Sequence, residues 1–177
     1  MKEKDIFHEC ICTGQKMTWE EWAQWVENHP SGEIVHRYGE FEYNIHDICL
    51  NPHKLIDFVD KSKNRFEITT CQVDNGKWGY GISYWFGTQG GGYAASFAMA
   101  THDTEKSAVY VALQEVELEC SKVINEIGRY GETSDYEDEN EGTSYFSSHL
   151  PKLKAVKNKI EVYKQQYNPI VLNLFGW

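Results

Sequence analysis

The chain has 177 residues, of which 41% are hydrophobic and 14% aromatic, and its net charge at pH 7 is −10. Such a chain is long enough to bury one core and too rich in large apolar side chains to be disordered. Gly and polar residues interrupt its apolar stretches, which excludes the run of about 20 apolar residues that a membrane helix needs. Residues 1–5 are charged and the five cysteines form no paired framework, so we expect a cytoplasmic protein with reduced thiols.

We predict an α+β fold in which helices pack on a mainly antiparallel sheet. A short helix is expected at about 18–28, because Thr18 and Glu21 form a Thr-x-x-Glu capping box ahead of an apolar stripe. Residues 34–38 and 41–48 are rich in β-branched and aromatic side chains, which indicates two short strands.

A second short helix is expected at about 52–61, where Asn51 and Pro52 are typical of a helix start. A long hairpin is predicted at about 65–86. Apolar and polar residues alternate along both of its arms, and Asp-Asn-Gly at 74–76 suits a tight turn. Small residues on the second face of the return arm would permit the close approach of a helix, a backbone or a ligand.

Glycine dominates the segment after the hairpin, which we expect to be a flexible loop before a third strand at about 93–99. The backbone amides of such a loop are able to cradle a phosphate or small ligand. The segment lacks the Gly-Lys-Ser/Thr end of a P-loop and the spacing of a dinucleotide-binding motif, which favours a permissive hairpin connection. The residues of this candidate ligand loop are Gly87, Thr88, Gln89, Gly90, Gly91 and Gly92.

Two longer helices complete the predicted fold. The longest is expected at about 104–127, with a continuous apolar stripe that should lie across the sheet, and six carboxylates within 132–141 indicate a solvated loop after it. A basic amphipathic helix is expected at about 151–166. Its lysines would lie in water or against the acidic surface, and the alternative is contact with nucleic acid through Lys152, Lys154, Lys157 and Lys159.

Charge divides this single domain into two parts. Residues 1–150, the acidic α+β body, contain 12 basic and 26 acidic side chains, a net charge of −14. Residues 151–177, the basic helix and an apolar tail, contain five lysines and one glutamate, a net charge of +4. An acidic body repels nucleic acid unless a basic element is held away from it, so a protein partner is favoured.

The tail sequence Val-Leu-Asn-Leu-Phe at 171–175 resembles the short linear motif by which bacterial DNA polymerases, repair proteins and some phage or plasmid proteins dock on the replicative sliding clamp. Val171 stands where that motif has glutamine. The resemblance implies a partner-binding set of Leu172, Leu174, Phe175 and Trp177. The alternative is an apolar C-terminal strand that buries these side chains against the sheet.

The body, with its aromatic hairpin, Gly-rich segment, strand and helix opened by Asp-Thr-Glu at 103–105, looks like small accessory proteins of bacterial phages and conjugative elements. This likeness implies a binding role in DNA replication or maintenance. No motif joins a nucleophile to a base or assembles metal ligands, so we favour a non-enzymatic protein without cofactor or metal, although an enzyme is not excluded. The alternatives are an acidic anti-defence inhibitor that mimics nucleic acid, and a small-molecule binder or enzyme that uses the loop at 87–92.

Overall fold

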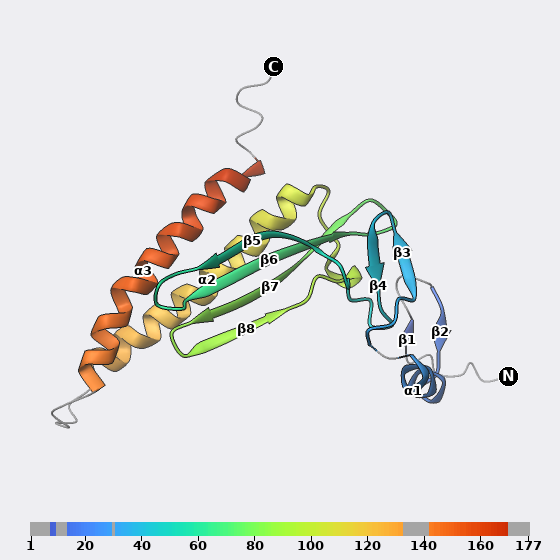
Figure 1. Cartoon of the computed structure of the whole chain (residues 1–177), viewed down its shortest axis with the longest axis horizontal. Helices are drawn as coiled ribbons and strands as arrows, with labels where there is room; N and C mark the ends of the chain where they lie inside the picture. Colours follow the sequence, from blue (N-terminus) through green and yellow to red (C-terminus); the bar gives the residue numbers. More distant parts are fainter. Residues whose placement is uncertain (1–7, 10–13, 30, 133–141, 170–177) are drawn as a thin grey trace, which may run out of the picture.

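The protein is an elongated α+β molecule, as predicted, with a long body and a small lobe at one end (Figure 1). The computed structural model describes the backbone of residues 8–9, 14–29, 31–132 and 142–169, and the side chains of 14–29, 31–129 and 148–169. No helix in those ranges is both long and apolar enough to cross a membrane.

The body contains one antiparallel sheet with the strand order β5-β6-β7-β8. The strands are β5 (His53–Val59), β6 (Arg65–Gln72), β7 (Trp78–Phe86) and β8 (Gln89–Tyr93). Strands β6 and β7 confirm the predicted hairpin at 65–86, and they pair in register from Arg65 with Trp85 to Gln72 with Trp78. The alternation seen in the sequence therefore assigns each residue of the hairpin to one face of the sheet.

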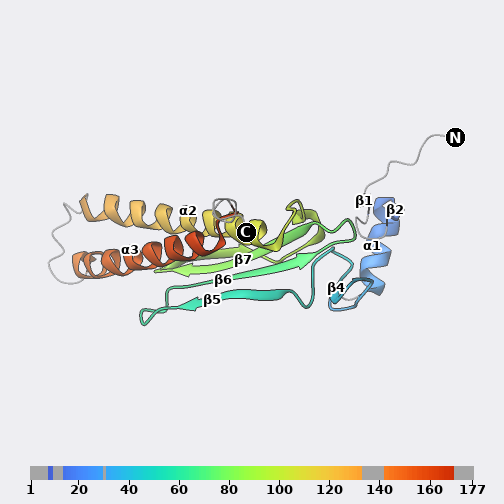
Figure 2. The same ribbon diagram turned by 90° about the horizontal axis from the view of Figure 1, so that it is seen from above.

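Two long helices cover one face of this sheet, and in the described part of the chain no α-helix lies on the other face (Figure 2). They are α2 (Glu105–Glu132) and α3 (Gly142–Tyr167), which run antiparallel (Figure 1). The apolar face of the hairpin packs against them in the main core, which includes Phe66, Ile68, Ile82, Leu113, Val116, Leu153 and Ile160. The expectation that the long helix lies across the sheet is thus confirmed.

The lobe (residues 14–51) is joined to the sheet by a second core that includes Tyr43, Cys49, Cys71 and Val73. The lobe contains β2 (Lys16–Met17), α1 (Trp19–Asn28), β3 (His36–Tyr38) and β4 (Phe41–Tyr43). Strand β1 (His8–Glu9) pairs with β2. The capping box predicted before α1 is present, since Thr18 and Glu21 bond to each other's backbone amides. The Tyr43 hydroxyl donates to the Gln72 carbonyl at 2.6 Å and fastens the lobe to β6.

The short helix predicted at 52–61 is wrong, because this segment forms strand β5. Asn51 does not cap a helix; its side chain bridges the backbone of Glu40 and Glu42 in the lobe. Pairing with β6 decides the conformation, and a β-bulge between Lys54 and Ile56 keeps the apolar residues on the core side. Tertiary contacts have overridden the local helix-start signal.

The Gly-rich segment is part of a hairpin, which confirms the expected hairpin connection, whereas the predictions of a flexible loop over all of 87–92 and of a strand at 93–99 are wrong. Gly87 and Thr88 form the turn, Gly87 having φ of +60°, and strand β8 begins at Gln89. The chain leaves the sheet after Tyr93 and forms a 3-10 helix, η1 (Phe97–Met99). Glycine at the first turn position suits the type II′ geometry of a two-residue hairpin loop.

Both long helices extend beyond their predicted ends. Helix α2 continues through Gly128 to Glu132, since one glycine costs about 1 kcal/mol in a helix and packing on the sheet offsets it. Helix α3 begins at Gly142, so Pro151 lies inside it and does not mark its start. The predicted acidic loop at 133–141 lies outside the described residues.

Candidate functional site

Strand β8 forms one edge of the main sheet and is exposed along its whole length. The two residues that flank a two-residue hairpin turn, here Phe86 and Gln89, are hydrogen-bonded to each other. Along antiparallel strands, hydrogen-bonded pairs alternate with pairs that are not hydrogen-bonded. Gly91 therefore bonds to β7, whereas Gly90 and Gly92 direct their N–H and C=O groups away from the sheet. In the described part of the chain, no other strand pairs with this edge.

The glycines of β8 are required by the aromatic rings of β7. A Cβ atom at Gly90 would lie 2.3 Å from the Trp85 ring, and one at Gly91 would lie 2.9 Å from the Tyr84 hydroxyl. Gly92 has φ of +145° and its Cβ would lie 2.1 Å from the Ile82 carbonyl oxygen. The Trp85 and Tyr84 side chains thus fill the space over the glycines on the two faces of β8, as aromatic residues do for glycine in edge strands.

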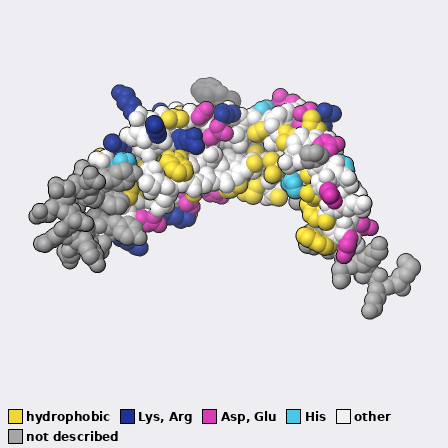
Figure 3. Space-filling view, turned by 60° about the horizontal axis from the view of Figure 1, so that its bottom comes forward, with side chains coloured by type: hydrophobic (Ala, Val, Ile, Leu, Met, Phe, Trp, Pro, Cys, Tyr) yellow, Lys and Arg dark blue, Asp and Glu magenta, His cyan; other side chains and the backbone are white. Residues whose placement is uncertain are grey.

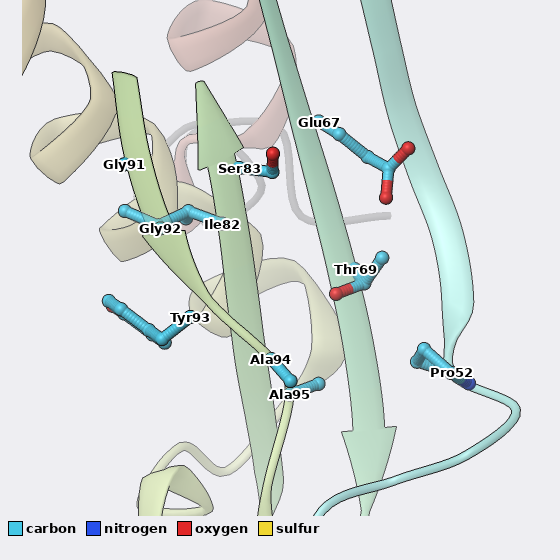
Figure 4. Close-up of a pocket in the computed structure, with 10 residues that line it drawn as sticks. All are labelled: Pro52, Glu67, Thr69, Ile82, Ser83, Gly91, Gly92, Tyr93, Ala94 and Ala95. Carbon is cyan, nitrogen blue, oxygen red and sulfur yellow. The ribbon is translucent and has the colours of Figure 1, made fainter. Parts of the chain in front are cut away.

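A groove of about 480 Å³ lies on the helix-free side of β8 (Figure 4). Thr69 and Ser83 contribute hydroxyl groups to its floor, and Glu67 contributes a carboxylate that pairs with Lys54 at 2.6 Å. Figure 4 shows Ser83 on β7 and Glu67 and Thr69 on β6, with Pro52 beyond them on the side away from β8. We call this the outer groove; its charge is balanced by the Lys54 pair.

The outer groove ends where the chain after β8 crosses the sheet. A Cβ atom at Gly81 would lie 2.3 Å from the Ala95 nitrogen, and one at Gly79 would lie 2.8 Å from the Ser96 carbonyl oxygen. Gly79 and Gly81 of β7 therefore allow the backbone after β8 to approach closely. From the sequence we expected a helix, a backbone or a ligand at this face. This crossing closes one end of the groove and positions Ala94 and Ala95 in its wall.

A second groove of about 330 Å³ lies on the helix side of β8, between this strand and α2. We call it the inner groove. Gly92 and Tyr93 of β8 line it from one side, and Glu115, Leu118 and Glu119 of α2 line it from the other. Leu118 is 56% exposed, so the inner groove joins an apolar spot to carboxylates.

Tyrosine hydroxyls hold the carboxylates of the inner groove. Tyr80 donates to Glu115 Oε1 at 2.6 Å, Tyr93 donates to the other oxygen of Glu115, and Tyr84 donates to Glu119 at 3.0 Å. Burial, and next to it the bond to Glu115, raises the pKa of Tyr80 to about 12. The same two causes raise the pKa of Tyr93. Both hydroxyls therefore remain donors at neutral pH.

The side of the molecule that carries the β8 edge is poor in charge over its middle. Figure 3, in which the lower side of Figure 1 is turned forward, shows mostly backbone and uncharged polar groups there, with hydrophobic groups nearby. β8 itself contains no Lys, Asp, Glu or Pro. Such residues normally protect an edge from pairing with another chain, so this edge is available for it.

A polar cluster with a histidine, two carboxylates and a hydroxyl lies between the lobe and the body. His53 bonds to Glu105 through Nδ1 at 2.9 Å and to Glu40 through Nε2 at 3.0 Å, and Thr70 donates to Glu105 at 2.7 Å. Two carboxylates on the two ring nitrogens favour the imidazolium form, which carries both N–H groups. The bond to Glu105, followed by that to Glu40, raises its pKa. The Thr70 hydroxyl faces Glu105 and not the ring, which is typical of a structural bridge between lobe and body.

The predicted site residues fall into three places. The ligand-loop residues form the turn and β8, and Gly91 and Gly92 line both a groove and the strand edge. Lys157 pairs with Glu117 of α2 at 3.6 Å and Lys159 lies over the Tyr163 ring, whereas Lys152 and Lys154 are exposed. The tail residues Leu172, Leu174, Phe175 and Trp177 lie outside the described residues.

Sequence reasoning missed the inner groove. Its signals are present in retrospect: Glu115 and Glu119 are four residues apart on one helix face, and Tyr80 and Tyr84 lie on one face of β7. Comparison with protein-family models, with curated proteins and with solved structures finds no match. Function must therefore be inferred from the geometry of β8 and its two grooves.

Proposed function

We propose that the chain is a non-enzymatic protein-binding module that takes an extended segment of a partner protein as an additional strand beside β8. The open edge of β8 supports this proposal above all: Gly90 and Gly92 present hydrogen-bonding groups to solvent, and a groove flanks the strand on each face. Strand addition obtains affinity from main-chain bonds and specificity from pockets for alternate side chains.

The expected affinity is moderate. Two outward glycines offer four backbone groups, and each hydrogen bond contributes about 1 kcal/mol net of lost water contacts. The ordering of a flexible segment opposes this gain, so side chains in the grooves must supply the rest. The rigid packing of Trp85 and Tyr84 on the glycines lowers the cost, because β8 is already extended before a partner arrives.

This proposal keeps the functional class predicted from the sequence and adds a binding surface. Docking on the sliding clamp through residues 171–175, a role in a phage or mobile element, and anti-defence inhibition remain separate predictions. The tail and β8 are different parts of the chain, so both surfaces are compatible with one protein. Binding of a peptide strand beside β8 does not require the small-molecule ligand that the sequence suggested for the segment at 87–92.

The test uses a library of dodecapeptides displayed on phage, selected on the immobilised wild-type protein. Enriched peptides are then measured against Gly90→Pro and Gly90→Ala by fluorescence polarisation. Both variants place a Cβ against Trp85, but only proline removes the outward N–H, and proline is tolerated at such edge positions. We expect Gly90→Pro to bind about tenfold or more weakly than Gly90→Ala, which shares the displacement of Trp85 but keeps the outward N–H.

Amide hydrogen exchange gives a second measurement on the same complexes. A peptide strand should slow exchange at Gly90 and Gly92 and change Gly91 little, because the Gly91 amide already bonds to β7. Enriched peptides that bind Gly90→Pro as well as the wild type, or that protect only α2 and α3, would contradict strand addition.

A further inference from the structure

We propose that the inner groove takes a lysine or arginine side chain of the segment bound at β8, with Glu115 as its counter-charge. This inference rests on the proposed function. It names the partner as an extended cationic segment, with a basic residue at the position opposite Gly91.

Register assigns the side chains of an added strand to the two grooves. Residues directly opposite in antiparallel strands share a face, and alternate residues point to opposite faces. A residue opposite Gly91 therefore points to the helix side, the face on which Tyr84 lies across from Gly91. The inner groove on that side is lined by Tyr84, Leu118 and Glu115. Residues opposite Gly90 and Gly92 point into the outer groove.

Glu115 carries a negative charge that lacks a cationic partner in the described part of the chain. Each of its oxygens accepts one tyrosine hydroxyl, from Tyr80 and Tyr93, and these neutral donors orient the carboxylate without cancelling its charge. Glu119 differs, since Lys122 pairs with it at 2.5 Å. A carboxylate oxygen holds more than one acceptor site, so Glu115 retains capacity for an incoming N–H group.

The shape of the inner groove suits a long basic side chain. Leu118, which is 56% exposed, provides an apolar wall for the aliphatic stem, and Glu115 lies beyond it for the charged head. A lysine or arginine uses both features at once, whereas a shorter polar side chain uses only one.

A second copy of this chain is a poorer occupant. Pairing of β8 with its symmetry mate would bring two copies of α2 together, each with Glu115 and Glu119 at the interface. Like charges so placed repel each other. The net charge of −10 opposes self-association further, and it attracts a cationic segment.

The first experiment needs no partner. Wild-type protein is titrated with n-butylguanidinium chloride and, separately, with n-butanol, while the Leu118 methyl and Tyr93 ring signals are followed by NMR. We expect saturable shifts for the cation alone. Glu115→Gln should weaken them about tenfold, while Glu20→Gln, which makes the same charge change on α1, should preserve them. The absence of cation-specific shifts in the wild type would overturn the inner-groove inference.

The second experiment uses the peptides selected on phage. A basic residue should recur at one position among alternating residues, and its replacement by norleucine should cost about as much as Glu115→Gln, with no further loss when the two changes are combined. Peptides that depend on the Gly90 amide but show no basic preference would refute the inner-groove inference and leave strand addition intact. Sedimentation that shows a dimer lost in Gly90→Pro would refute both.

Discussion

The two edges of the main sheet differ in how they meet solvent. Strand β5 carries exposed Lys54 and Asp57 and has a bulge after Lys54, which are devices that discourage pairing with another chain. Strand β8 carries no charge, and its five residues are all exposed. One sheet therefore has a protected edge and an open edge.

The edges also differ in how each is fastened to α2. β5 begins at His53, whose imidazolium lies between the carboxylates of Glu40 and Glu105. β8 ends at Tyr93, whose neutral hydroxyl bonds to Glu115. The protected edge depends on an imidazole whose pKa the two carboxylates raise above its ordinary value, and the open edge on hydroxyls that titrate only at high pH. Because solvation would weaken an ion pair beside a binding groove, neutral donors suit the open edge.

The largest expected effect on stability comes from Gly92→Ala, which changes the open edge strand β8. At φ of +145° an alanine is strained, and its Cβ would meet the Ile82 carbonyl at 2.1 Å. We expect a loss of about 3 kcal/mol in the free energy of unfolding, measured by urea denaturation. The matched control is Gly128→Ala in α2, where nothing lies within 4 Å of the added Cβ, and there we expect a gain of about 1 kcal/mol. Equal effects at the two glycines would show that β8 does not need its special geometry.

Much of this fold was predictable from local patterns, but the open edge was not. Alternation assigned the faces of β6 and β7, and the capping box located α1, because both signals act within a few residues. β5 was mistaken for a helix, since its strand conformation depends on pairing with β6. The glycines of β8 suggested a loop because the rings that cover them belong to β7.

The candidate site was predictable only in part. The glycines at 90–92 suggested a phosphate cradle, whereas in the structure Gly90 and Gly91 make room for the side chains of Trp85 and Tyr84 over an edge strand. Glu115 looked like one of many surface carboxylates, because its tyrosine partners are 35 and 22 residues away in the chain. No local pattern reports such a contact.

A medium effect is expected from Tyr80→Phe, which removes a buried donor from Glu115. The loss should be about 1 kcal/mol at pH 7. The pKa of Tyr80 is raised to about 12, above the ordinary value of 10, so its contribution is present below pH 10 and is lost as pH rises toward 12. The difference between wild type and variant, from urea denaturation, should therefore shrink between pH 10 and 12. A difference that stays constant across this range would contradict the tyrosine anchor.

The smallest effect should come from His53→Gln at the protected edge. The carboxylates of Glu105 and Glu40 raise the pKa of His53, so the stabilisation is fully present below the unfolded value of about 6.5 and is lost as pH rises through the higher folded value. The ring is 34% exposed, so solvent limits the contribution to less than about 1 kcal/mol. Urea denaturation at pH 6 should separate wild type from His53→Gln, and at pH 9 the two should converge. His29→Gln, which replaces a ring bonded to the Trp25 carbonyl, serves as the control for loss of a histidine away from β5. If the difference in stability between wild type and His53→Gln is instead larger at pH 9 than at pH 6, a charged His53 does not stabilise β5. The proposed difference between a charged contact at β5 and a neutral one at β8 would then be wrong.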